Sequence, residues 1–296
     1  MNILVVEDSK LERLYLKDFF FNKFNYNVLV ASDGYEALEI HNNQNIDLMV
    51  LDLIMPGISG FEVCEEIRKK ENNSDHYTYI IMLTGRTDKE DIIKGLEIGA
   101  DDYVIKPFDE NELRVRISVG ERIVSMYKKI LELNKKLEYE STHDDLTKIY
   151  NRKEIYSRLK NELSNNPIIA ILDLDFFKKI NDTYGHLAGN YVLSEFAKIV
   201  KEIVGDFGEF GRFGGEEFLI FFKGNILESQ ALEILEKIRN IIYMYDFNFE
   251  GQSIKVTVSI GATRNNGQYN IDQILAIADD NLYEAKKEGR NRIIYK

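Results

Sequence analysis

Short apolar runs alternate with amphipathic segments over the first 120 residues. Segments such as 10–21 and 34–41 carry apolar residues at helical spacing and lie between the runs. We expect strands at residues 3–6, 28–31, 48–51, 79–83 and 103–105. Strands that alternate with helices are typical of a parallel α/β sheet. The pattern therefore predicts a flavodoxin-like, doubly wound domain over residues 1–120.

Polar residues follow four of these predicted strands. Glu7 and Asp8 follow the first, Asp52 the third, Thr84 the fourth and Lys106 the fifth. In doubly wound sheets, functional groups lie at the carboxyl ends of the strands. Three carboxylates at one edge repel each other, so a divalent cation with oxygen ligands is the natural relief. A hydroxyl and an ammonium beside them would suit an added phosphoryl group.

A second polar cluster precedes the apolar run 218–222, which we expect to be a buried strand. Gly214 and Gly215 come first, and glycine permits positive φ and a close approach to a ligand. Glu216 and Glu217 follow at once. A hairpin turn with adjacent acids at the mouth of a sheet suits a metal-bound phosphate. The alternative is a hairpin whose acids are merely solvated.

Residues 110–141 contain no proline and one internal glycine, Gly120, and they predict one long helix. An apolar seam with alternating four- and three-residue steps runs along it and indicates a coiled coil. The seam residues are Ile123, Tyr127, Ile130, Asn134, Leu137 and Ser141. Because the seam is short, a helix packed on its own chain is the alternative. We assign residues 109–142 to this connector, which overlaps the last helix of the first domain, and residues 143–296 to a second domain.

Composition narrows the classes of function. Net charge is −12 and apolar residues make up 44% of the chain, which argues against a nucleic-acid surface. Cys64 is the single cysteine, so no intramolecular disulfide can form. No run approaches the roughly 18 apolar residues of a membrane helix. We expect a cytoplasmic protein with neither a membrane nor a nucleic-acid partner.

The strand-end residues of the first domain resemble those of the receiver domain of response regulators, and the resemblance covers residues 1–120. It implies Mg²⁺ binding by Glu7, Asp8 and Asp52. It also implies that Asp52 accepts a phosphoryl group from a cognate sensor histidine kinase. Thr84 and Lys106 would contact the phosphoryl oxygens, and Tyr103 would be the aromatic switch residue.

The segment Gly-Gly-Glu-Glu-Phe at 214–218 resembles the signature of the GGDEF family, the diguanylate cyclases. Segments 143–152, 173–190 and 278–291 match the family's other motifs, so the resemblance covers the whole second domain. It implies a nucleotidyl-cyclase-like α/β domain with a mainly antiparallel central sheet. Members condense two GTP molecules to cyclic di-GMP and two pyrophosphates. Because each domain holds one GTP, we expect a homodimer through the receiver face and the connector helix, activated by phosphorylation.

The resemblance also assigns roles in the second domain, where catalysis is mainly positioning and charge stabilisation. The cyclase Mg²⁺ ligands would be Asp173, Glu216 and the backbone carbonyl of Leu174, and Mn²⁺ could replace Mg²⁺. Glu217 would help to deprotonate the ribose 3′-OH or support the metal. The GTP phosphates would contact the backbone of Phe176 and Phe177 and the side chains of Lys178, Lys286 and Arg290. The catalytic set is Glu217, Glu216, Asp173 and Lys178.

Two departures from the family pattern concern selectivity and feedback. Guanine would be read by Asn181 and Asn190, where the family has Asp at the second position. Asn offers guanine one acceptor and a mismatched donor, at a cost of about 1–3 kcal/mol. Relaxed purine selectivity, with a hybrid cyclic dinucleotide as product, or a weakly catalytic GTP-binding module are therefore the alternatives. Gly205 and Gly208 stand where many members carry R-x-x-D, so we expect no product-inhibition site.

Overall fold

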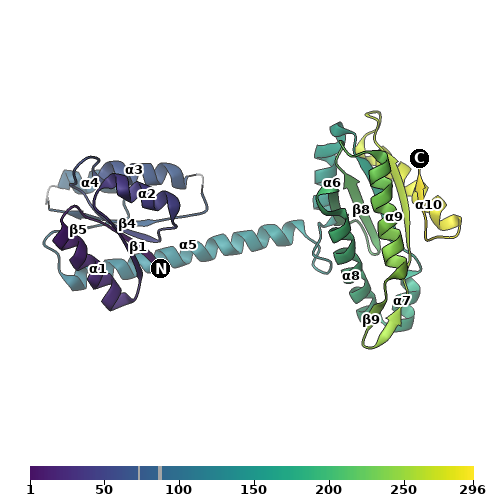
Figure 1. Ribbon diagram of the computed structural model, residues 1–296, viewed down its shortest axis with the longest axis horizontal. Helices are drawn as coiled ribbons and strands as arrows, with labels where there is room; N and C mark the ends of the chain where they lie inside the picture. Colours follow the sequence, from purple (N-terminus) through teal and green to yellow (C-terminus); the bar gives the residue numbers. More distant parts are fainter. Residues whose placement is uncertain (73, 86–88) are drawn as a thin grey trace. The chain divides into compact units, whose positions relative to one another are not determined.

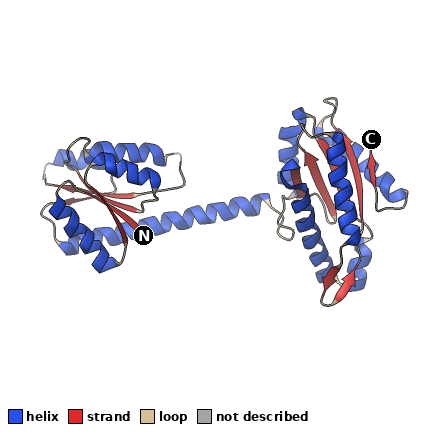
Figure 2. Cartoon of the chain, in the orientation of Figure 1, coloured by secondary structure: helices blue, strands red, loops and turns tan. Residues whose placement is uncertain are grey.

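The computed structural model describes residues 1–72, 74–85 and 89–296. These residues form two compact units, Met1–Lys135 and Lys136–Lys296 (Figure 1). Each unit contains a β-sheet with helices packed on it (Figure 2).

The first unit is built on a five-stranded parallel sheet in the order β2-β1-β3-β4-β5. The strands are β1 (Asn2–Val6), β2 (Asn27–Ala31), β3 (Leu48–Asp52), β4 (Tyr79–Thr84) and β5 (Asp102–Ile105). The helices are α1 (Lys10–Phe24), α2 (Gly34–Asn43), α3 (Gly60–Glu71), α4 (Lys89–Ile98) and α5 (Glu110–Thr142). All five predicted strands are present, and the doubly wound fold is confirmed.

The apolar runs are buried on both faces because alternate strand residues point to opposite sides of the sheet. On β1, Leu4 and Val6 belong to a core with residues of α2 and α3. Ile3 and Val5 belong to a second core with residues of α1 and α5. Cys64 is fully buried in the first core, as a small apolar residue would be.

Helix α5 confirms the predicted long connector helix. Its first turns bury Leu113, Ile117, Gly120 and Val124 against the sheet. A Cβ on Gly120 would lie 2.6 Å from Cδ1 of Tyr79, so the close approach of helix and sheet requires glycine there. Within the described part of the chain, no helix is both long enough and apolar enough to cross a membrane.

The second unit contains a five-stranded sheet in the order β12-β11-β6-β8-β7. Its pairings are antiparallel except that of β11 with β12, so the predicted mainly antiparallel sheet is confirmed. The sheet strands are β6 (Ile168–Leu174), β7 (Gly208–Arg212), β8 (Glu217–Phe222), β11 (Val258–Arg264) and β12 (Ile293–Tyr295). A separate hairpin consists of β9 (Phe247–Phe249) and β10 (Gln252–Ile254).

Helices cover both faces of this second sheet. They are α6 (Arg152–Glu162), α7 (Phe177–Tyr184), α8 (His186–Val204), α9 (Glu228–Met244) and α10 (Ile271–Lys287), with short 3-10 turns at Leu163–Asn165 and Gly205–Phe207. Phe196 of α8 and Leu235 of α9 lie in one core, and Ile155 of α6 and Ala278 of α10 lie in the other. Strand β6 lies in the middle of the sheet and is buried along its whole length, so Asp173 and Leu174 at its end have fixed positions.

Candidate functional site

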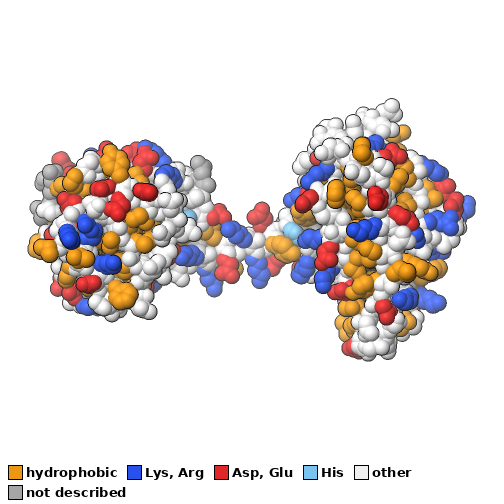
Figure 3. All heavy atoms as spheres, viewed as in Figure 1, with side chains coloured by type: hydrophobic (Ala, Val, Ile, Leu, Met, Phe, Trp, Pro, Cys, Tyr) orange, Lys and Arg blue, Asp and Glu red, His pale blue; other side chains and the backbone are white. Residues whose placement is uncertain are grey.

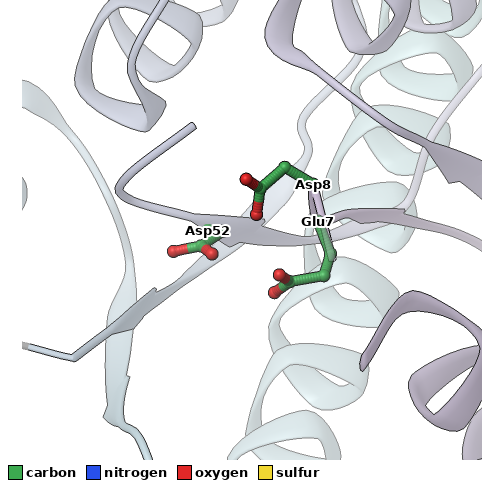
Figure 4. Close-up of side chains that lie close together, drawn as sticks. All are labelled: Glu7, Asp8 and Asp52. Carbon is green, nitrogen blue, oxygen red and sulfur yellow. The ribbon is translucent and has the colours of Figure 1, made fainter. Parts of the chain in front are cut away.

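Three carboxylates meet at the carboxyl edge of the first unit's sheet. Strands β1 and β3 are parallel neighbours, with Val6 opposite Leu51, so Glu7 follows its strand beside Asp52. Oxygen atoms of Glu7, Asp8 and Asp52 lie within 4.8 Å of one another, and the three side chains point toward a shared space (Figure 4). Such a set of oxygen ligands fits a divalent cation.

The electrostatics of this cluster support the same fit. Glu7 is 1% exposed, and its burial raises its pKa to about 7; the nearby Asp52 charge adds to the rise, while Lys106 opposes it. The Nζ of Lys106 lies 2.7 Å from Glu7 Oε2 and 2.8 Å from Asp52 Oδ2. Burial alone would lower the pKa of Lys106, but its hydrogen bonds to carboxylates raise it. A cation would relieve the repulsion that remains between the acids.

The other predicted residues of this edge lie close by. Thr84 ends β4 and is 3% exposed. Tyr103 lies on β5, lines the same small cavity as Thr84, and has the Arg116 guanidinium 5.9 Å from its ring centre. The Lys106–Pro107 peptide is cis. Sequence reasoning missed Glu12, whose carboxylate lies 2.9 Å from Lys106 Nζ; its place in the first turn of α1 was the available signal.

In the second unit, the hairpin β7–β8 carries the two adjacent glutamates. The backbone N–H groups of Phe213 and Gly214 donate to Glu217 O, at 2.8 and 3.1 Å, and close the turn. Neither Gly214 nor Gly215 has a positive φ, so this turn does not need glycine for its backbone conformation. A Cβ on Gly214 would lie 2.6 Å from Glu217 Oε2, whereas Gly215 faces open space. The glycines therefore leave the backbone of the turn accessible.

Register brings the acids of two strands together. Strand β6 pairs with β8 so that Asp173 lies opposite Glu217, and Leu174 N–H donates to Glu216 O at 3.3 Å. Asp173 is 7% exposed, and Lys286 Nζ lies 2.9 Å from its Oδ2. Burial raises the pKa of Asp173 to about 6; Lys286 lowers it and the two glutamates of the turn raise it. The carboxylates of Asp173 and Glu216, together with the Leu174 carbonyl, are hard oxygen donors of the kind that suit a divalent cation.

The start of α7 follows directly on β6. Phe176 has φ 57° and ψ 28° and caps the helix without a side-chain hydrogen bond. Among the hydrogen bonds of the described residues, none uses the N–H groups of Phe176, Phe177 or Lys178 as donors. Open N–H groups at a helix start suit anionic groups. Lys178 is exposed there, and the Arg290 guanidinium lies 4.4 Å from the centre of the Phe176 ring.

The two asparagines assigned to base recognition lie on neighbouring helices. Asn181 is on α7 and is half-buried, and Asn190 is on α8 and is exposed. A Cβ on Gly189 would lie only 2.0 Å from Asn181 Oδ1, so the helices approach closely because that residue is glycine. The structure thus brings both amides to the same helix pair.

Glycines occupy both positions at which R-x-x-D would place Arg and Asp. Gly205 ends α8 with φ 49°, and Gly208 begins β7. A Cβ on Gly208 would lie 2.5 Å from Phe221 O, so this backbone leaves no room for an aspartate side chain.

Arg212 and Asp144 are site-supporting residues that sequence reasoning missed. Arg212 Nη1 donates to both carboxylate oxygens of Asp144, at 3.1 and 3.2 Å. Arg212 Nη2 also donates to Gly215 O at 2.7 Å. Burial favours the neutral form of Asp144, but bonds from Thr147 and Arg212 lower its pKa. This pair ties the hairpin turn to the segment after α5. Both residues lie within or beside the quoted motifs, which was the available signal.

Comparison with known proteins matches each half of the chain to a known family. Residues 141–292 match the family described as diguanylate cyclase, GGDEF domain, and residues 3–118 match the response regulator receiver domain. Response regulator PleD of Caulobacter vibrioides is 31% identical over 279 residues, 90% of this chain and 60% of PleD. Diguanylate cyclase A of Treponema denticola is 42% identical over 130 residues, 42% of this chain and 34% of that protein. The chain thus spans at most 60% of the length of these two curated relatives.

Solved structures agree as well. The coiled coil and GGDEF domain of DgcB from Caulobacter crescentus, solved with c-di-GMP, is 26% identical with a TM-score of 0.55, covering 64% of this chain and 100% of that one. Diguanylate cyclase SiaD from Pseudomonas aeruginosa, solved with its activator SiaC, is 32% identical with a TM-score of 0.52, covering 63% and 74%. Both resemblances seen in the sequence are confirmed. The chain belongs to the GGDEF diguanylate cyclase family and carries a response regulator receiver domain before its GGDEF domain.

Proposed function

We propose that this protein is a phosphorylation-activated diguanylate cyclase that condenses two GTP molecules to cyclic di-GMP and two pyrophosphates as a homodimer. One observation carries the proposal. Asp173, opposite Glu217 and paired with Lys286, lies at the end of the strand that leads into the open N–H groups of α7. Carboxylates, a cation and unpaired amides at one strand end are what a metal-bound triphosphate needs.

Each group at this end has a part in the reaction. Asp173, Glu216 and the Leu174 carbonyl would hold Mg²⁺ or Mn²⁺, which when bound neutralises phosphate charge. The N–H groups of Phe176 and Phe177 donate to the terminal phosphate oxygens.

Cationic side chains and one glutamate complete the chemistry. Lys178, Lys286 and Arg290 balance the charge of the triphosphate and of the leaving pyrophosphate. Glu217 accepts the proton of the attacking 3′-OH or supports the metal ligands. The new bond joins that 3′ oxygen to the α-phosphorus of the second GTP, and the bond to pyrophosphate breaks.

The acidic cluster at the carboxyl edge of the receiver domain's sheet would control the cyclase activity. Asp52 would accept the phosphoryl group from a cognate sensor histidine kinase. Glu7, Asp8 and Asp52 would hold Mg²⁺, which would neutralise charge on that group. Lys106 and Thr84 contact the new oxygens, and Tyr103 repacks in response. The short distances from Lys106 to Glu7 and Asp52 support this arrangement, because a single ammonium already bridges the acids that phosphorylation would rearrange.

A homodimer is required because each GGDEF domain holds one GTP. Helix α5 supports a coiled coil, but in a register that differs from the predicted one. Tyr127 packs against Tyr77 within the first unit, with ring centres 5.2 Å apart, so it is not available to a partner. Five of the large exposed apolar residues of α5 follow alternating three- and four-residue steps: Ile123, Met126, Ile130, Leu133 and Leu137. We define these five residues as the α5 stripe and propose it as the dimer seam.

A hybrid cyclic dinucleotide synthase is the second candidate, and Asn190 is the observation that favours it. Its side chain is exposed on α8, beside the helix that carries Asn181. An amide there offers a donor where guanine also offers donors. The base-binding site would then discriminate weakly between guanine and adenine.

The first prediction concerns catalysis. Asp173→Asn and Glu216→Gln should each lower the rate of cyclic di-GMP formation by roughly a hundredfold or more, because each removes a charge that stabilises the transition state. Product would be measured by chromatography after incubation with GTP and Mg²⁺. Glu233→Gln, an exposed glutamate on α9, is the matched control and should leave the rate unchanged. Full activity in both site variants would contradict the assignment.

The second prediction concerns the switch. Asp52→Asn should abolish stimulation of cyclase activity by beryllofluoride, because the acceptor carboxylate is gone, while GTP affinity stays the same. Rates and GTP binding would be compared with those of Asp18→Asn, an exposed aspartate on α1. Continued stimulation of the Asp52 variant would rule out control through this residue.

A third prediction separates the two possible registers of α5. Leu133→Lys should weaken the activated dimer by about tenfold or more, because a charge would be buried in the seam. Asn134→Lys, one position along, should leave the dimer intact. Sedimentation velocity in beryllofluoride measures both. The reverse result would restore the register that includes Asn134, and no effect of either would place the dimer contact elsewhere.

The fourth prediction concerns the base. Asn190→Asp should raise the preference for GTP over ATP roughly tenfold, since a carboxylate accepts from both donors of guanine and the mismatch costs about 1–3 kcal/mol. Products formed from mixed GTP and ATP would be separated by chromatography. If the native chain already excludes ATP as strictly as the variant does, relaxed selectivity is wrong.

A further inference from the structure

A cavity of about 890 Å³ lies against α7, and neither asparagine assigned to guanine lines it. Its walls come from α7, the end of α9, β10 and the segment that leads into β11. The α7 residues in the wall are Lys179, Ile180, Thr183 and Tyr184; Asn181 is not among them. In Figure 1, α7 and the β9 hairpin lie at the same end of this unit. The volume is in the range of pockets that hold small molecules.

The cavity combines an apolar floor with exposed aromatic walls. Ile254 and Val256 are buried in its floor. Tyr184 and Tyr243 are 38% and 53% exposed, and Met244 is 76% exposed. Among the described residues, no hydrogen bond engages either phenol oxygen. Aromatic rings and a flexible thioether around an apolar floor suit a planar, largely apolar ligand.

Two lysines at the cavity offer cations to an anionic group of a ligand. Lys179 and Lys255 both line it. Lys179 has no ion pair within the part of the chain that the structure describes, and Lys255 lies 3.7 Å from Asp246. The one carboxylate in the wall, Asp175, is 4% exposed and fully engaged. It accepts from Thr257 Oγ1, Ser259 Oγ and Asn291 N at 2.6, 2.7 and 3.1 Å. Figure 3 shows Lys and Arg side chains interspersed with Asp and Glu side chains over the visible face of this second unit.

We propose that this cavity is a binding site for a small aromatic anion. The planar ring would contact Tyr184 and Tyr243, and a carboxylate, sulfonate or phosphate group would pair with Lys179 and Lys255. The cavity lies next to the proposed cyclase site, and one residue, Phe176, belongs both to the cavity and to the proposed phosphate-binding end of the cyclase site. Phe176 lines the cavity and also stacks against Arg290 at 4.4 Å.

That shared ring links the ligand to GTP, a step that rests on the proposed function. Phe176 holds a left-handed backbone conformation directly before the open N–H groups of α7. A ligand that packs on its ring would restrict this residue and the Arg290 side chain above it. Restricting groups that GTP must otherwise order tightens GTP binding. By reciprocity, GTP tightens binding of the anion by the same factor.

The first experiment measures binding to the full chain without GTP. The probe is 8-anilinonaphthalene-1-sulfonate, an aromatic anion whose fluorescence rises in apolar sites. We expect saturable binding that Thr183→Trp, which fills the cavity, and Lys179→Ala, which removes a cation, each weaken by about tenfold. Lys198→Ala, an exposed lysine on α8, should bind as the native chain does. Thermal melting of each variant shows that it is folded.

Three results would overturn the proposal. One is equal binding of the sulfonate to the native chain and to folded Thr183→Trp, which would place the probe elsewhere. The second is equal binding of N-phenyl-1-naphthylamine, the neutral relative of the probe, and the third is no loss of sulfonate binding in Lys179→Ala. Either of these last outcomes would mean that the charge of the ligand is not recognised.

The second experiment measures GTP binding by calorimetry with and without saturating sulfonate. We expect about fivefold tighter GTP binding in its presence for the native chain and no change in Thr183→Trp. Unchanged or weaker GTP binding in the native chain would overturn the link through Phe176. Failure to bind GTP under either condition would instead count against the proposed cyclase function, and the sulfonate titration would still decide the cavity.

Discussion

The antiparallel pairing of β6 with β8 is the constraint on which the second unit's site depends. With Asp173 opposite Glu217, the end of one strand meets the turn before the other. A shift of one residue would turn each side chain to the opposite face. Burial of both strands, from Ile168 opposite Phe222 onward, makes such a shift costly. The acids therefore meet because the apolar core of the sheet aligns them.

In both units, a buried aspartate at a strand end is paired with a lysine. Asp52 is the last residue of β3 and Asp173 the last but one of β6. Each has a lysine Nζ within 3 Å, Lys106 at 2.8 Å and Lys286 at 2.9 Å. A charge in the interior is costly unless it is paired, so the lysine makes each acid tolerable in the fold. The pair stays at the sheet edge, where water and ions can reach it. A lysine beside a buried acid is thus a structural requirement that would also supply positive charge in the proposed phosphate chemistry.

The proposed ligand site at α7 would give this short helix a second role. Asn181 lies on α7, other α7 residues line the cavity, and the start of the helix carries open N–H groups. Asp175 joins these parts, since it is bonded to the β11 region and to the segment that holds Arg290. A ligand bound on either side of this helix would therefore affect the proposed phosphate-binding end through backbone and ring contacts rather than through a large movement.

The local sequence pattern determined much of the secondary structure and many of the candidate site residues. Strand positions, the long helix and the acids at Glu7, Asp8 and Asp52 could all be predicted, because side-chain periodicity and strand ends are properties of consecutive residues. The order of a parallel sheet then decides which strand ends are neighbours, so these acids were also expected to meet. The motifs of the second domain likewise indicated Asp173 and its partners.

Only the tertiary structure decided the features that depend on contacts between distant residues. Tyr127, which the sequence pattern placed on the apolar seam of α5, packs on Tyr77 of its own unit. The Arg212–Asp144 pair joins residues 68 positions apart, and the cavity at α7 forms where three separate segments meet. Periodicity tells which face of an element is apolar. Which neighbour covers that face, and which part of it stays uncovered, follows from how the whole chain packs.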